Sequence, residues 1–268
     1  TKESDLFAER GIVFKKTFLN LDNGPLAARQ MEEDWGEALG ISTEESLRAT
    51  QLGLAAMSEF KAARRKEARA IIGQLEAENR LGIVLLARPY HNDPGINHGI
   101  CEEFQKLGYP VIAAESLPLD DDIVDRLFGE DVRSGVINSP FDINDVWKNS
   151  YSENTSRKLW SAKYVARHPN LVALEFSNFK CGHDAPIYTV IEEIVENSRT
   201  PFFYFKDIDE NKPTGAIKIR VETIAYFLAR FRERLLAEDA KRNGIERELR
   251  AFEERLRAGT DAQQLRAM

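Results

Sequence analysis

The chain has 268 residues, of which 43% are hydrophobic and 30% are charged, and its formal net charge is -7. This length can bury one large core or two smaller ones. The acidic balance argues against a general nucleic-acid binder, which usually presents a basic face.

Targeting and partner signals are sparse. No apolar run approaches the roughly 18 residues that span a bilayer, and no secretory signal is visible. The two cysteines, Cys101 and Cys181, form neither a C-x-x-C pair nor a disulfide framework. We therefore expect a cytoplasmic protein with no nucleic-acid or membrane partner. Because the chain begins with Thr1, we also expect it to be a segment of a longer protein.

Residues 1–80 are predicted to form a mainly helical region. The stretch from Ser42 to Glu45 has the spacing of a capping box. One face of the helix that follows carries Leu47, Thr50, Leu54 and Met57.

Residues 81–223 are predicted to form a Rossmann-like α/β domain. Short apolar runs rich in β-branched or aromatic residues lie at 83–86, 111–114, 136–137, 171–176 and 202–205. Amphipathic stretches lie at 100–107, 123–128, 156–167 and 187–195. Alternating strands and helices indicate a doubly wound, mostly parallel sheet of about four or five strands, flanked by the N-terminal helices and a C-terminal helical arm.

Residues 224–268 are predicted to be that arm or a helical hairpin. Apolar residues recur with helical spacing before and after Gly244, as Ile224, Leu228, Phe231 and Leu235 and then Ile245, Leu249, Phe252 and Leu256. This stripe could pack on the α/β domain, or it could dock to a partner or to another part of the parent chain.

Three polar loops, 88–99, 177–186 and 206–215, follow predicted strands. Ligands in open α/β sheets bind beyond the carboxyl ends of the strands, so these loops are the candidate site. The third loop precedes a helix whose N-terminus could hold an anion, with Lys212, Thr214 and Gly215 as candidates. Arg88 in the first loop is a further anion-binding candidate. A capped helix that binds no ligand is the alternative.

The first loop carries His91, Asp93 and His98 as candidate catalytic groups. Pro89 and Pro94 stiffen this loop. Asn97 or His98 is expected to cap a helix over 99–107. The His91-x-Asp93 spacing could bind a metal if a third ligand came from elsewhere. The alternative is an elaborate turn with exposed histidines.

The second loop, "SNFKCGHDAP", carries Cys181, His183 and Asp184 just before a helix that opens at Pro186. A thiol near a helix N-terminus and a histidine is expected to have a lowered pKa. Cys181 could therefore be a cluster ligand, a nucleophile or an inert residue. His183 and Asp184 are candidate catalytic groups, although the pair falls in a loop rather than on a helix.

The blocks "GIVLLARPYHNDPGINHGI", "EFQKLGYPVIAAESLP", "NLVALEFSNFKCGHDAPIY" and "PFFYFKDIDENKPTGAIKIRVETIAYFL" resemble the acyl-CoA dehydratase activase-related proteins. These CoA-substrate-specific enzyme activases of anaerobes are related to 2-hydroxyglutaryl-CoA dehydratase and benzoyl-CoA reductase systems. The resemblance covers about residues 82–228 and is weaker in the N-terminal part. It implies an ATPase module and a dehydratase-like module with a cysteine-bound iron–sulfur cluster.

On this resemblance the chain is expected to be part of the dehydratase-like module, in a multi-domain enzyme, and not active alone. Cys181 is the implied cluster and metal ligand, and Cys101 is a second candidate. A cluster usually takes four thiolates, so the missing ligands would come from the rest of the parent chain or from a second copy in a homodimer. No phosphate-binding glycine motif appears, so ATP is not expected to bind here.

The expected function is a dehydratase- or reductase-like domain acting on an acyl-CoA thioester or another small molecule. One alternative is a non-catalytic scaffold or docking domain of a large activase-related protein. Another is a metal-dependent hydrolase that uses His91, Asp93, His98 and His183.

Overall fold

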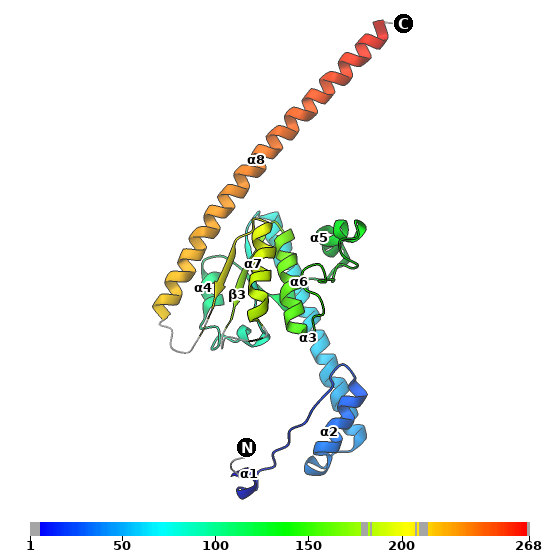
Figure 1. The fold of residues 1–268 in the computed structure, drawn as a ribbon, viewed down its shortest axis with the longest axis vertical. Coiled ribbons are helices and arrows are strands. Elements are labelled where there is room, and N and C mark those ends of the chain that lie inside the picture. Colours follow the sequence, from blue (N-terminus) through cyan, green and yellow to red (C-terminus); the bar gives the residue numbers. More distant parts are fainter. Residues whose placement is uncertain (1–5, 178–181, 183, 207, 209–213, 267–268) are drawn as a thin grey trace. The chain divides into compact units, whose positions relative to one another are not determined.

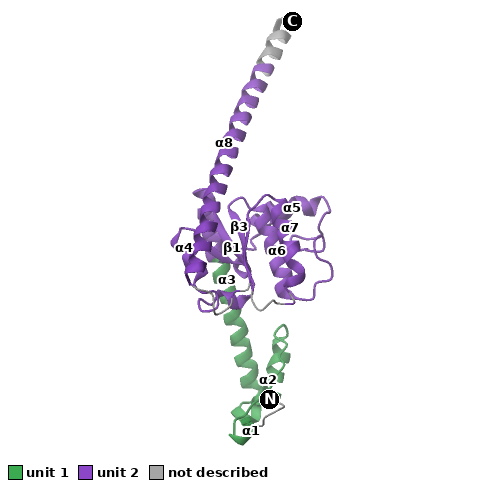
Figure 2. Ribbon diagram, turned by 60° about the vertical axis from the view of Figure 1, so that its left-hand side comes forward, with its two compact units in different colours: residues 1–66 green, residues 67–268 purple. Residues whose placement is uncertain are grey.

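The chain consists of two compact units, residues 1–66 and 67–268 (Figure 2). The computed structural model describes residues 6–177, 182, 184–206, 208 and 214–266, with side chains up to Leu256. The boundary between the units falls inside helix α3 (Thr43–Ala77).

The first unit is helical and has a small core. It contains α1 (Leu6–Glu9), α2 (Gly24–Leu39) and the first part of α3. Ser42 Oγ accepts a hydrogen bond from the Glu45 backbone N–H at 3.3 Å, and Glu45 Oε2 accepts one from the Ser42 N–H at 2.8 Å. The predicted capping box is therefore confirmed.

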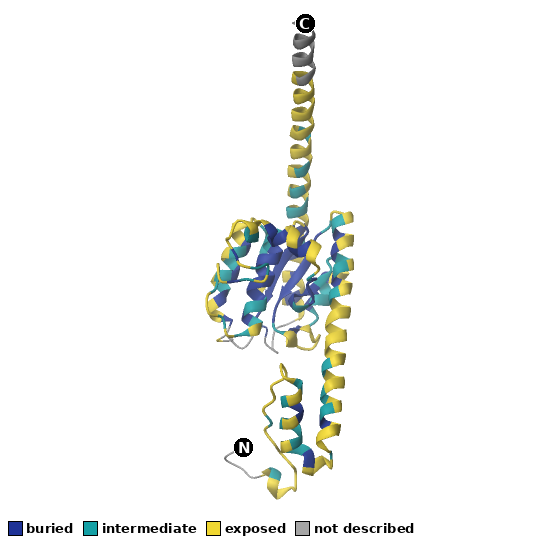
Figure 3. Ribbon diagram, turned by 90° about the vertical axis from the view of Figure 1, so that its right-hand side faces the viewer, coloured by how far each residue is buried: buried dark blue, intermediate teal, exposed yellow. Residues whose placement is uncertain are grey.

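The second unit is built on four parallel strands in the order β2-β1-β3-β4. Figure 1 shows β3 within this sheet. The strands are β1 (Gly82–Leu86), β2 (Val111–Ala113), β3 (Leu171–Phe176) and β4 (Phe202–Phe205). β1 and β3 are buried along their whole length (Figure 3). This burial explains why their sequences are continuously apolar rather than alternating.

Helices cover both faces of the sheet. They are α4 (Ile100–Lys106), α5 (Asp121–Arg133), α6 (Glu153–Arg167), α7 (Tyr188–Asn197) and α8 (Thr214–Arg266). Val84 and Leu86 face a core formed with the end of α3 and with α5, α6 and α7. Ile83 and Leu85 face a second core formed with α4 and α8. The predicted doubly wound, parallel α/β fold is confirmed.

The expected strand at 136–137 is wrong. The backbone N–H groups of Val136 and Ile137 both donate to the Asp131 carbonyl, at 2.9 and 3.3 Å, and Gly135 takes a φ of 77°. This is the C-terminal closure of α5, where a left-handed glycine satisfies the last carbonyls of a helix. Only Ile137 is buried there, whereas Val136 is exposed.

The C-terminal segment forms one helix, α8, which continues through Gly244, so the hairpin alternative is wrong. Its first part packs on the sheet, with Leu228 fully buried. Beyond this part the apolar stripe is exposed, and Ile245 and Phe252 are 54% and 55% accessible. Across the part of the chain that the structure describes, no helix is long and apolar enough to cross a membrane.

Candidate functional site at the carboxyl ends of β1 and β3

The strand order creates a switch point between β1 and β3. From β1 the chain goes on to β2 at one side of the sheet, and from β3 it goes on to β4 at the other. Connections that diverge in this way leave a crevice beyond the carboxyl ends of the two neighbouring strands, and ligands of open α/β sheets bind there. The loops that follow β1 and β3 border this position.

An ion pair joins the two loops. Arg88, two residues after β1, places its Nη2 2.7 Å from Oδ1 of Asp184 and its Nε 3.4 Å from Oδ2. The Asp184 side chain is 1% exposed and that of Arg88 is 12% exposed. Two nitrogens of the guanidinium each face one oxygen of the same carboxylate. A paired contact of this kind is directional, so it fixes the first loop relative to the second.

A second buried ion pair lies next to the first. Lys158 of α6 places its Nζ 2.7 Å from Oε1 of Glu175 on β3 and 3.5 Å from Oδ2 of Asp184. Each of these three side chains is 1% exposed. A buried charge is tolerated when it is paired, so the four groups stabilise one another as a network.

Glu175 is the group with the most unusual environment. Burial raises the pKa of its carboxyl, and the nearby Asp184 raises it further, while Lys158 lowers it. Its Oε2 has no hydrogen-bond partner among the described residues. A buried acceptor that lacks a partner is costly, which makes this atom a place where a water or ligand donor would bind favourably.

The third loop contributes a cation beside two aromatic rings. Lys206 follows β4 directly and places its Nζ 4.1 Å from the ring centre of Tyr204 and 5.4 Å from that of Tyr188. The Tyr188 hydroxyl is hydrogen-bonded to the Ser177 hydroxyl at the end of β3. Residues from the loops after β1, β3 and β4 therefore converge on one region.

His91 of the first loop has structural partners. His91 is fully buried, and its Nδ1 accepts a hydrogen bond from the Arg88 backbone N–H at 3.1 Å. Its carbonyl accepts from the Asn97 side chain at 3.0 Å. His98 is half-buried and has a φ of 54°. The alternative in which both histidines are exposed is therefore wrong for His91.

Asp93 forms a turn. Its Oδ1 accepts hydrogen bonds from the backbone N–H groups of Gly95 at 2.8 Å and Ile96 at 3.2 Å. This is the Asx geometry that a short polar side chain makes with its own backbone. The expected helix cap at Asn97 or His98 is wrong, because Gly99, with a φ of 70°, is the capping residue of α4.

The two candidate cluster ligands are Cys101 and Cys181. Cys101 lies on α4, and burial, with the nearby Glu102 carboxylate, raises the pKa of its thiol to about 12. The thiol is therefore protonated at neutral pH. Cys181, His183 and Lys212 lie outside the described residues.

Two further predictions concern a metal site and the third loop. Within the described ranges, no group of three or more His, Cys, Asp or Glu side chains is arranged to hold a metal. Thr214 and Gly215 are exposed in the first turn of α8.

Sequence reasoning identified Arg88 and Asp184 as site residues but missed Lys158 and Glu175. One signal was present: Glu175 is the single charged residue in the strand "LVALEF". A charge in a strand buried on both faces requires a partner of opposite charge, and Lys158 on the buried side of α6 is that partner.

Fold and site together define a doubly wound α/β unit with a buried cluster of charged side chains at its switch point. Residues 2–117 match a family model described as a CoA enzyme activase uncharacterised domain. The match covers less than half of the chain and includes β1, Arg88, α4 and β2. It supports a relationship to activase-related proteins. Comparisons with curated proteins and with solved structures found no significant match.

Proposed function

We propose that this chain is the dehydratase- or reductase-like part of an iron–sulfur redox system in an activase-related protein. Its site lies where the loops after β1 and β3 meet. The family match supports the general class. The observation that carries the site is the Arg88–Asp184 ion pair, which joins the first loop to the loop that contains Cys181.

Each charged residue has a defined task in this proposal. Lys158, which is paired with Glu175, holds the Asp184 carboxylate, and Asp184 orients the Arg88 guanidinium. Arg88 and Lys206 supply positive charge for a carbonyl oxygen or an anionic group of an acyl-CoA thioester or a similar small molecule. A preorganised cation favours charge that develops on such an oxygen during reduction.

The described residues alone do not fit an iron–sulfur cluster, because they include a single cysteine, the half-buried Cys101, and no group of three or more His, Cys, Asp or Glu side chains arranged to hold a metal. In this proposal Cys181 is the cluster ligand of the chain. The remaining ligands come from the rest of the parent chain or from a second copy, and an ATPase module of the parent chain is the partner that drives electron transfer.

Anaerobic reconstitution with iron and sulfide tests this assignment. The chain should take up iron and sulfide and gain a broad visible charge-transfer absorbance. Cys181→Ser should abolish that absorbance. The matched control, Cys101→Ser, should keep it, since no group of ligand side chains surrounds Cys101 among the described residues. A colourless protein after reconstitution, or equal colour in the Cys181→Ser variant, would contradict the proposal.

A docking domain is the second candidate function. The observation that favours it is the exposed stripe of α8, where Ile245, Leu249, Phe252 and Leu256 are each more than half accessible. Four large apolar side chains at helical spacing form a surface that another helix can cover. A chain that stays colourless after reconstitution but binds the rest of its parent protein through this stripe would favour docking over the redox function.

A further inference from the structure

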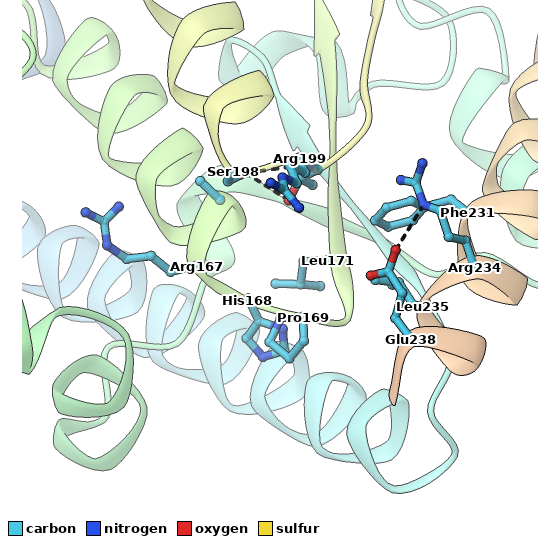
Figure 4. A pocket seen from close by; sticks show the side chains of 12 residues that line it. Arg167, His168, Pro169, Leu171, Ser198, Arg199, Phe231, Arg234, Leu235 and Glu238 are labelled. Atoms are coloured by element: carbon cyan, nitrogen blue, oxygen red, sulfur yellow. Dashed lines mark hydrogen bonds and ion pairs between the residues drawn. The ribbon is translucent and has the colours of Figure 1, made fainter. Parts of the chain in front are cut away.

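A second candidate binding region lies at the opposite end of the sheet, beside the first residue of β3. A pocket of about 570 Å³ is bordered there by the segment 166–171, the turn between α7 and β4, and α8 (Figure 4). This volume falls within the roughly 300–1,000 Å³ of small-molecule sites. Its apolar lining is formed by Pro169, Leu171, Phe231 and Leu235.

The charged lining of the pocket is mainly basic. Arg167, Arg199 and Arg234 line it together with one carboxylate, that of Glu238. His168 adds no charge at neutral pH, because burial lowers its pKa to about 4. The pocket is therefore suited to an anion.

The three arginines differ in their partners. Arg167 donates to the Asp131 carboxylate at 2.6 Å, and Arg234 lies 3.9 Å from Glu238. Among the described residues, no acidic side chain neutralises Arg199. Its guanidinium is thus the lining cation that is available to a ligand.

The backbone of Arg199 supports a specific role for its side chain. Arg199 follows Ser198, the capping residue at the C-terminal end of α7, and has a φ of 62°. Helices commonly end with glycine in this left-handed conformation, because other L-residues are strained there. Strained positions of this kind concentrate at functional sites. An arginine at this position makes the fold less stable than a glycine would. It also places a guanidinium at the rim of the pocket.

We propose that this pocket binds an organic phosphate, with Arg199 as the phosphate anchor. The Ser198 hydroxyl gives its single proton to the Val195 carbonyl at 2.6 Å, so the 3.0 Å contact between the Ser198 and Thr200 hydroxyls uses the Thr200 proton, and Arg199 is the group that remains to bind the phosphate oxygens. Leu171 and Phe231 cover the apolar part of the ligand. This site lies away from the crevice between β1 and β3 and does not depend on the redox proposal.

Calorimetric titration of the full chain with phenyl phosphate tests the proposal. Binding should be saturable and tighter than that of inorganic phosphate, which lacks the apolar part, and phenol should not bind. Arg199→Gly should weaken binding about tenfold or more, because a hydrogen bond to a charged group is lost. The same variant should raise the midpoint temperature of unfolding, because glycine relieves the backbone strain.

Two further variants make the result specific. Asn149→Gly replaces another residue with positive φ, 57°, and should leave phenyl phosphate affinity unchanged. Glu238→Gln removes the lining carboxylate and should tighten binding. Absence of saturable binding, unchanged affinity in Arg199→Gly, or equal affinity for benzoate would each overturn the assignment of a phosphate site.

Discussion

Lys158 and Glu175 carry the most consequential single contact of the second unit, because both side chains are buried at 1% exposure. Lys158→Met would leave the Glu175 carboxylate buried without its cation and should destabilise the protein by roughly 3–5 kcal/mol. Glu175→Gln should cost less, because the amide oxygen still accepts from Lys158, and Lys158 still faces Asp184. The double variant should be clearly less destabilised than the sum of the two, as measured by denaturant unfolding.

An exposed ion pair provides the control for this cycle. Arg230 and Glu233 lie 3.2 Å apart, and both are 66% exposed. Their double-mutant coupling should be within about 1 kcal/mol of zero. Additive effects for Lys158 and Glu175 would mean that their ion pair does not stabilise the fold.

His168 should make stability depend on pH. Its Nδ1 accepts from the Asn170 N–H at 3.2 Å, so the proton sits on Nε2, which lies 3.0 Å from Glu76. Burial lowers its pKa from 6.5 to about 4. The unfolded chain therefore takes up a proton on His168 below about pH 6.5, whereas the folded chain takes it up only near pH 4. The free energy of unfolding should fall by about 3 kcal/mol as the pH is lowered across that range.

Unfolding measured from pH 7 to 4 checks this expectation. His168→Asn keeps a polar side chain but cannot take up the proton, so its stability should decline less steeply between pH 6.5 and 4. An equal slope in the two proteins would show that other groups cause the acid sensitivity.

At the residue scale, the sequence predicted which loops come together better than it predicted which atoms make the contacts. Arg88 and Asp184 could be nominated because they follow strands. The buried role of His91 and the turn formed by Asp93 could not, since both depend on hydrogen bonds to particular backbone atoms. Lys158 was missed because its partner lies 17 positions away and only the fold brings the two together.

At the element scale, hydrophobic runs predicted β1 and β3 well, because strands buried on both faces are uniformly apolar. The edge strand β4 was also predicted, although Phe205 is its one buried residue. The same rule failed at 136–137, where two apolar residues only close the end of α5. Gly244 suggested a hairpin, but one glycine inside a long helix costs only about 1 kcal/mol and does not break it.

The exposed stripe of α8 predicts self-association. Ile245, Leu249, Phe252 and Leu256 repeat at the spacing of a coiled-coil seam. The full chain should therefore form a homodimer in sedimentation experiments. Leu249→Glu or Phe252→Glu should shift it to monomer, because a charge in the seam would be desolvated.

Ala251→Glu is the matched control, since Ala251 is exposed and falls outside the seam. It introduces the same side chain one turn or less from both test positions and should leave the dimer intact. A wild-type chain that is monomeric at all concentrations would exclude self-association through α8.

At the scale of the whole molecule, the two units differ greatly in their cores. The first unit buries few residues, among them Ala27, Ala28 and Ser46. The second buries two clusters, one on each face of the sheet. Because stability follows buried apolar area, the first unit should open far more readily than the second.

Hydrogen exchange within α3 tests this difference inside one helix. Up to Lys66 the helix belongs to the first unit, and its side chains are mostly exposed. From Glu67 onward, Ala68, Ile72 and Leu75 enter the core under the sheet. Backbone amides of 68–77 should exchange as slowly as those of β1 and β3, whereas amides of 47–62 should exchange faster by several orders of magnitude. Uniform protection along α3 would contradict the division, because local opening follows packing rather than helix membership.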